Sequence, residues 1–274
     1  MKEKASSRIH YYENSQGPVI GTCSDKVIRE DGLYFRDING DGKLNTYKDW
    51  RKSPEERARA LSEDLSAEEK IGLLFLNSWK MGMEQEDKDF VDVTGLLDEK
   101  PVEKGSSIFA TSSTVGTTET IKDWKVRTFI LRSNPKPDEL ADWINEMNSL
   151  AEEGEHFIPV MVVSNSRNEN GEVVFGMNDA SGVFAAWPGT MGIAAAVKGD
   201  GIHIIDDFAD CIRREWDAVG MKKGYMYMAD CATDPRWQRT YGTFGEDPKL
   251  IKEIFEHLIP GVQGSQEGLT PDGV

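Results

Sequence analysis

Arginine, tryptophan and carboxylate side chains gather in one segment of the sequence, residues 230–247. Asp230, Arg236, Trp237 and Arg239 all lie in its first ten residues. An arginine can donate hydrogen bonds to hydroxyl groups while a neighbouring indole ring stacks on an apolar face of the same ligand. The same composition is typical of a loop that pairs its own charges. The residues alone therefore leave a ligand-binding loop and an ion-paired loop as alternatives.

A second group of oxygen-bearing side chains lies near the N-terminus, in Asp37-Ile-Asn-Gly-Asp-Gly-Lys-Leu-Asn-Thr-Tyr-Lys-Asp49. Its spacing is that of a calcium-binding loop, with Gly42 at the sharp turn. The candidate ligands are oxygens of Asp37, Asn39, Asp41, Lys43 and Asp49. Position 12 of such a loop should be a bidentate glutamate, but here it is Lys48, whose ammonium opposes a dication. A Ca²⁺ site and a metal-free turn held by Asx side chains therefore remain alternatives.

The elements that must position these segments begin with two helix-start signals. Ser53-Pro-Glu-Glu56 and Ser66-Ala-Glu-Glu69 each have the form of a capping box, and each predicts a helix. Ile71, Leu74 and Phe75 give the second helix an apolar stripe. Residues 1–36 are polar and without periodicity, which predicts an extended arm.

From residue 127 onward the sequence alternates between strand and helix patterns. Short apolar runs predict buried strands at 127–132, 158–164 and 225–229. Apolar residues at helical spacing predict helices at 140–150, 205–219 and 248–258. This order indicates a parallel sheet covered by helices, in which ligands bind on the loops that follow the strands. Both 165–178 and 230–247 are such loops.

The composition excludes several classes of protein. The chain has 274 residues and a formal net charge of −16, so nucleic acid is disfavoured as the main partner. Three separated cysteines indicate neither a disulfide framework nor a CxxC zinc site. No segment has the length and apolarity of a membrane span, and residues 1–20 contain no signal-peptide core. We expect a cytoplasmic chain if Met1 is native, and a periplasmic or secreted one if a leader was removed.

Two motifs within the arginine-rich loop are more specific. Asp234-Pro-Arg-Trp-Gln-Arg239, followed by Phe244-Gly-Glu-Asp-Pro248, resembles the signature of glycoside hydrolase family 3, the β-glucosidases and their relatives. Three other segments match the family in the same order: Leu65-Ser-Ala-Glu-Glu-Lys-Ile-Gly72, Ile158-Pro-Val160 and Trp187-Pro-Gly-Thr-Met-Gly-Ile-Ala-Ala195. The similarity extends over about residues 35–264.

This resemblance assigns roles to individual residues. It implies that Arg239 binds hydroxyls of the terminal sugar, and that Asn165 and Arg167 lie among further sugar contacts. Many family members have an aspartate where this chain has Asn165. Asp230 and Trp237 would support the same site by orienting arginines and stacking on the sugar. For Asn165 and Arg167 a capped turn, and for Asp230 a purely structural role, remain alternatives.

The resemblance also implies a fold and a mechanism. Family members have a (β/α)8 TIM-like barrel and a retaining mechanism, with an aspartate nucleophile on a later strand and a glutamic acid/base further along. No residue of this chain matches either group. We therefore expect about the first half of the barrel, with residues 1–52 as an N-terminal arm carrying the calcium-like loop and residues 53–274 as the partial barrel.

The resemblance makes the complete protein a retaining exo-acting β-glycosidase for terminal β-linked glucose or xylose. This segment would supply sugar-binding residues, need no organic cofactor and be inactive alone. Because half a barrel leaves strand edges bare, we expect a second chain or the remaining part of the enzyme to complete it. The alternative is a non-catalytic sugar-binding or complementing module.

Overall fold

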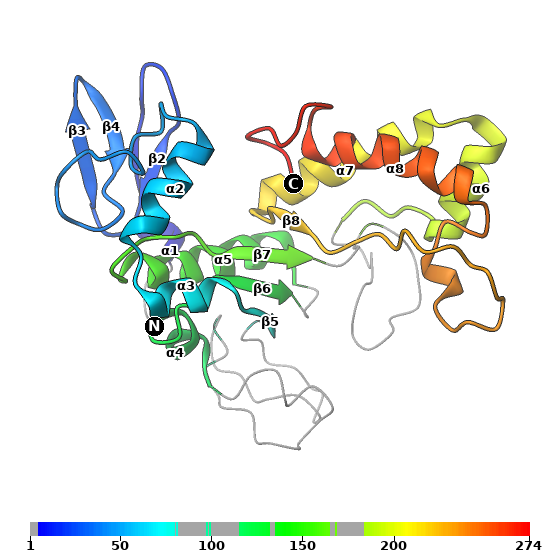
Figure 1. Cartoon of the computed structure of the whole chain (residues 1–274), viewed down its shortest axis with the longest axis horizontal. Coiled ribbons are helices and arrows are strands. Elements are labelled where there is room, and N and C mark those ends of the chain that lie inside the picture. The colour runs from blue at the N-terminus through cyan, green and yellow to red at the C-terminus, as the bar shows by residue number, and fades with distance from the viewer. Residues whose placement is uncertain are drawn as a thin grey trace. The chain divides into compact units, whose positions relative to one another are not determined.

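The computed structural model describes residues 5–79, 81, 97, 99, 115–131, 135–164, 168 and 184–274 (Figure 1). The chain divides into two compact units. The N-terminal unit consists of Met1–Phe129 and Ala141–Val160, and the C-terminal unit consists of Ile130–Leu140 and Met161–Val274.

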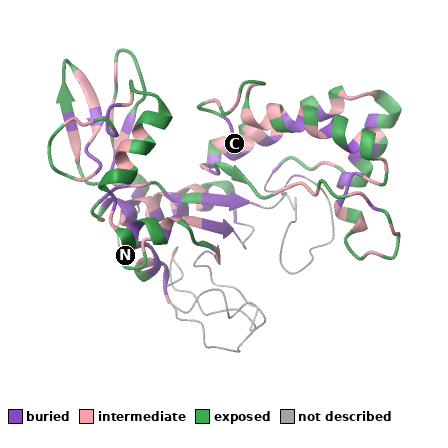
Figure 2. Cartoon of the chain, viewed as in Figure 1, coloured by how far each residue is buried: buried purple, intermediate pink, exposed green. Residues whose placement is uncertain are grey.

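Four strands form one sheet in the order β5 (Leu76–Trp79), β6 (Thr128–Leu131), β7 (Met161–Ser164) and β8 (Lys223–Gly224). Strands β7 and β8 are parallel, with Ser164 opposite Gly224. Most side chains of β6 and β7 are buried, as Figure 2 shows, because strands of a parallel sheet have apolar neighbours on both faces. The prediction of an α/β fold with a parallel sheet is confirmed, whereas closure into a barrel stays a prediction.

The first 36 residues are not the extended arm that we expected. They contain a short helix and two antiparallel hairpins: α1 (Ala5–Arg8), β1 (His10–Tyr12), β2 (Ile20–Thr22), β3 (Val27–Glu30) and β4 (Leu33–Arg36). Asp31 and Gly32, which join β3 to β4, have φ angles of 51° and 77°. Two positive φ angles match the twist of the flanking strands, and Asp-Gly is one of the dipeptides that adopt them readily. The prediction rested on the weak apolar alternation of these residues. It failed because the Asp31-Gly32 turn favours a hairpin even where that alternation is weak.

Both capping boxes start helices as predicted. Helix α2 (Pro54–Asp64) begins after Ser53 and α3 (Ala67–Leu73) begins after Ser66, and in each the serine side chain accepts a bond from the backbone N–H three residues later. The apolar stripe does not become buried, however. Helix α3 ends at Leu73, and the next two residues, Leu74 and Phe75, are 85% and 53% exposed.

Two further helices complete the first part of the chain. They are α4 (Thr117–Lys122) and α5 (Pro137–Glu152). Helix α5 bears the predicted apolar face, with Leu140, Trp143, Ile144 and Met147 buried.

Three long helices dominate the C-terminal unit: α6 (Thr190–Asp200), α7 (His203–Val219) and α8 (Pro248–Gln263). Helix α7 contacts both α6 and α8, and Figure 1 shows α7 and α8 side by side. The predicted face of α7 is buried along its length, and Gly220 ends the helix with a φ of 82°. A left-handed residue at this position is the conformation that favours glycine.

The third predicted strand is displaced. The sheet hydrogen bonds fall on β8 at Lys223–Gly224 and on the N–H of Tyr225, which donates to the Ser164 carbonyl at 2.7 Å. Met228 makes only an isolated parallel bridge to Thr243. Among the described residues, no helix is both long and apolar enough to cross a bilayer.

The crossing of α7 and α8 leaves no room for a side chain at Gly261, because a Cβ there would lie 2.5 Å from the Cβ of Ala209. We expect Gly261→Ala to lower the free energy of unfolding by about 1–3 kcal/mol, since overpacking outweighs the helix propensity gained. Gly199, also helical, faces open space, and a Cβ there would have no other atom within 4 Å. Gly199→Ala should therefore raise the free energy of unfolding in urea by up to about 1 kcal/mol. Equal changes in the two variants would contradict the close contact of Gly261 with Ala209.

Candidate functional site

The loop of residues 230–247 follows β8 and is fixed near its C-terminal end. The N–H of Ala232 donates to the Gly245 carbonyl at 2.9 Å, and the Thr190 hydroxyl donates to the Tyr241 carbonyl at 2.9 Å. Thr243 and Phe244 are buried. The loop is thus attached to the start of α6 and to its own base, which leaves its central residues toward solvent.

Arg236 is used within the loop. Its Nε donates to Asp234 Oδ1 at 2.9 Å and its Nη2 donates to Asp234 Oδ2 at 2.5 Å, while the side chain stays 89% exposed. The bonds from Arg236 hold the pKa of the Asp234 carboxyl below its usual value. For Arg236, the self-pairing alternative is therefore the one that the structure contains.

Arg239 differs from Arg236 in having no paired carboxylate among the residues that the structure describes. It is exposed, it lies just before the 3-10 turn η1 (Thr240–Gly242), and its carbonyl accepts a bond from the N–H of Gly242 at 3.0 Å. In the part of the chain that the structure describes, its guanidinium forms no ion pair.

Trp237 and Asp230 lie on the same loop. Trp237 is half-buried, and its N–H donates to the Asp234 carbonyl at 3.0 Å. Its own carbonyl accepts from the Thr240 hydroxyl at 2.7 Å, so Trp237 and Arg239 are carried by one hydrogen-bonded turn. Asp230 is exposed, between the bridge at Met228 and the anchored Ala232.

The remaining predicted sugar contacts, Asn165 and Arg167, lie outside the described residues. Their position in the chain is nevertheless informative, because they directly follow β7. Ser164 at the end of β7 pairs with Gly224 in β8, so the loops that follow these strands leave the sheet at the same edge. Parallel α/β proteins bind ligands at that edge. The roles of all five residues stay predictions.

A buried polar cluster that the sequence did not predict includes Asn168, on the loop that follows β7. Asn168 is fully buried, and its amide donates to Glu215 Oε2 at 2.5 Å and to the Ala185 carbonyl at 3.3 Å. Its side-chain oxygen accepts from the indole Nε1 of Trp216 at 3.0 Å. The cluster ties the loop after β7 to α7. No sequence signal could have found it, because Asn168 and Trp216 are distant in the chain.

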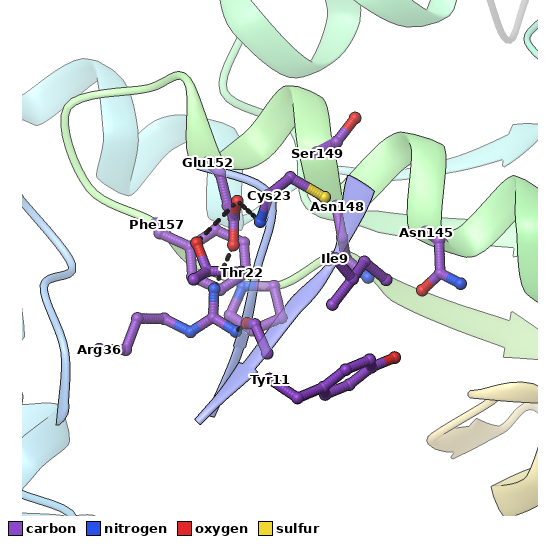
Figure 3. A pocket seen from close by; sticks show the side chains of 12 residues that line it. Ile9, Tyr11, Thr22, Cys23, Arg36, Asn145, Asn148, Ser149, Glu152 and Phe157 are labelled. Carbon is purple, nitrogen blue, oxygen red and sulfur yellow. Dashed lines mark hydrogen bonds and ion pairs between the residues drawn. The ribbon is translucent and has the colours of Figure 1, made fainter. Parts of the chain in front are cut away.

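A pocket of about 320 Å³ in the N-terminal unit lies between the first hairpin and α5 (Figure 3). Glu152 is central to it. Its carboxylate accepts bonds from Arg36, from the Cys23 N–H at 2.8 Å and from the Thr22 hydroxyl at 3.3 Å. These partners satisfy the carboxylate, so the pocket marks the attachment of the hairpin to α5 rather than a site for chemistry.

The predicted calcium ligands converge on a lysine. Lys48 Nζ donates to Asp37 Oδ1 at 2.6 Å, to Asp41 Oδ1 at 2.5 Å and to the Lys43 carbonyl at 3.0 Å. The bond from Lys48 lowers the pKa of Asp41 to about 2. Asp49 instead accepts two bonds from Arg51, each at 2.8 Å.

The remaining candidate, Asn39, accepts a bond from the Asp41 N–H at 3.3 Å through its side-chain oxygen. No group of three or more His, Cys, Asp or Glu side chains suited to a metal ion occurs among the described residues. Calcium binding stays a prediction.

Comparison with known proteins decides the family. The sequence model of the glycosyl hydrolase family 3 N-terminal domain matches residues 97–272. The chain belongs to glycosyl hydrolase family 3. A periplasmic β-glucosidase/β-xylosidase of Dickeya chrysanthemi is 34% identical over 260 residues, covering 94% of this chain and 36% of that protein. The resemblance carried by the loop motifs is thereby confirmed.

Two other proteins are similar to this chain. A probable β-glucosidase C of Aspergillus oryzae is 30% identical over 223 residues, covering 81% of this chain and 31% of that protein. The structure of a β-glucosidase from Erythrobacter marinus matches with a TM-score of 0.54 and 19% identity, covering 83% of this chain and 26% of that one. That last likeness shows the fold alone. The chain spans about a third of the length of the curated relatives that it matches.

The buried cluster of this family 3 chain can be tested by a double-mutant cycle. Asn168→Ala leaves the indole N–H of Trp216 without its acceptor, and we expect a loss of about 1–3 kcal/mol in the free energy of unfolding. Trp216→Phe removes the donor and some packing. The two losses should not add in the double variant, because they share one hydrogen bond. Additive losses in denaturant unfolding would show that the bond contributes nothing.

Proposed function

We propose that the complete protein is a retaining exo-acting β-glycosidase that hydrolyses terminal β-linked glucose or xylose. The observation that carries this proposal is membership of family 3, with 34% identity to a periplasmic β-glucosidase/β-xylosidase over nearly the whole chain. In this proposal the present chain supplies part of the site for the non-reducing sugar.

Arg239 is the first residue that we assign to sugar binding. Its exposed guanidinium carries several donors in a planar fork, which suits two neighbouring hydroxyls. Trp237, on the same turn, offers an indole face for the apolar side of the ring. Asn165 and Arg167 would contribute from the loop after β7, and Asp230 would orient the arginines.

The chemical step needs two carboxyl groups about 5–5.5 Å apart, one as nucleophile and one as acid and base. The nucleophile attacks the anomeric carbon and forms a glycosyl-aspartate, while the acid protonates the leaving oxygen. Water, deprotonated by the same group, then releases the sugar with its configuration retained. We assign neither role to a residue of this chain. We assign both to the remainder of the complete protein.

That remainder, in the same chain or in a second one, would also complete a TIM-like barrel. Strands β5 and β8 are the two edges of the described sheet, and edge strands present unpaired backbone groups. Ile71, Leu74, Phe75 and Leu76, just before and within β5, are apolar and between 45% and 85% exposed. Further barrel elements would cover such residues.

A non-catalytic sugar-binding module is the second candidate. It is favoured by one observation: among the described residues Arg239 has no carboxylate partner on its exposed loop, while we assign no catalytic role to any residue of this chain. Both candidates bind a sugar, but only the β-glycosidase hydrolyses it.

Sugar binding is tested directly by titration calorimetry of the chain with glucose. We expect Arg239→Ala to weaken binding roughly 10- to 100-fold, which corresponds to the loss of hydrogen bonds from a charged donor. Arg236→Ala is the matched control, because that arginine lies in the same loop but is paired with Asp234. Equal losses in both variants, or none in either, would remove Arg239 from the site.

Catalysis is tested by measuring the intact mass of the purified protein together with its activity on an aryl β-glucoside and an aryl β-xyloside. We expect hydrolysis when polypeptide beyond the 30.7 kDa of this chain is present, with the β-anomer of the sugar appearing first by NMR. Sugar binding without hydrolysis in such a preparation would favour the module. Hydrolysis by the 30.7 kDa chain alone would show that it contains its own catalytic carboxylates.

A further inference from the structure

The loop from Asp37 to Lys48 is folded like a calcium-binding loop but encloses an ammonium group. Asp37, Asp41 and the carbonyl of Lys43 occupy positions 1, 5 and 7, which supply the ion with oxygen ligands in an EF-hand. Lys48 Nζ bonds to these same oxygens at 2.6, 2.5 and 3.0 Å. Lys48 is itself position 12, where an EF-hand has its bidentate glutamate.

The ammonium group is fully satisfied where it lies. The Lys48 side chain has no exposed surface, and that of Asp37 is 9% exposed. A buried charge is tolerated only when it is paired and hydrogen-bonded. An ammonium has three N–H donors, and the three acceptors use all of them. No position remains around this nitrogen for another cation.

Backbone N–H groups of the loop hold the carboxylates of Asp37 and Asp41 in place. The N–H of Gly42 donates to Asp37 Oδ2 at 2.9 Å, and the N–H of Lys43 donates to Asp41 Oδ1 at 2.8 Å. The side-chain oxygen of Asn45, at position 9, is buried and has no hydrogen-bond partner among the described residues. An EF-hand uses position 9 as a further ligand, often through water.

We propose that Lys48 is the resident cation of this loop, and that it replaces calcium in the native protein. The loop therefore folds without a divalent ion. We also propose that a single substitution would let the loop bind calcium, because the EF-hand ligand that its sequence lacks is the glutamate at position 12. Lys48→Glu would remove the competing ammonium and add two oxygens, which converts the loop into a calcium site.

The experiment compares thermal unfolding of the full chain in millimolar CaCl2 and in EDTA, with calcium titration calorimetry on the same samples. We expect the wild-type Tm to be equal in both solutions. Lys48→Glu should melt several degrees higher in CaCl2 than in EDTA and bind Ca²⁺ with a Kd on the order of 10⁻⁵–10⁻³ M. Lys43→Glu is the matched control, since it makes the same charge change in the same loop through a residue that offers only its carbonyl. Its Tm should not depend on calcium.

Each other outcome has a defined meaning. A wild-type Tm that rises with calcium would overturn the proposal, because the ion would then displace Lys48. If Lys48→Glu folds but its Tm does not depend on calcium, the proposal that this substitution creates a calcium site is wrong. An equal calcium-dependent rise in the Tm of Lys43→Glu would also contradict it. If Lys48→Glu folds in neither solution, Lys48→Gln decides, since it removes the charge and keeps an oxygen at position 12. A calcium-dependent rise in its Tm supports the proposal, and a constant Tm overturns it.

Discussion

The parallel pairing of β7 with β8 is the constraint on which the candidate site depends. Parallel neighbours end at the same edge of a sheet, so the alignment of Ser164 with Gly224 brings the loops after both strands to one place. The connection between such strands must cross over the sheet, and here it contains α6 and α7. Within this crossover, the buried indole of Trp216 on α7 donates to Asn168 on the loop after β7.

Buried charge is the second organising feature, and it is concentrated in the N-terminal unit. Glu152 attaches a hairpin to α5, and Lys48 closes the Asp37 loop. In both cases a charged group removed from water is surrounded by opposite charge and by backbone groups. Removing one partner from such an arrangement costs more than the whole arrangement contributes, because a lone charge stays behind. These polar contacts thus add to apolar ones in the N-terminal unit, such as the stacked rings of Phe35 and Trp50.

Local signals in the sequence predicted several elements whose structure is decided by neighbouring residues. The serine capping boxes and the helical spacing of apolar residues in α7 were both predicted from neighbouring residues, and the loop motifs identified the family. The Asp31-Gly32 turn was equally local and was overlooked. Two features could not be read from the sequence. The position of β8 is set by its pairing with β7 rather than by the apolar run at 225–229, and Asn168 bonds to a residue of a helix far along the chain.

The ammonium in the Asp37 loop is joined covalently to the chain that it organises. A free ion leaves and returns, and its occupancy follows its concentration in the surroundings. A tethered group has a fixed effective concentration, so dilution and chelators cannot deplete it. The same attachment prevents the loop from responding to ion concentration. Lys48 therefore stabilises the loop constantly, and the loop does not act as an ion sensor. Because lysine and glutamate codons differ by a single nucleotide, one point mutation at Lys48 would convert the loop into a calcium-responsive one.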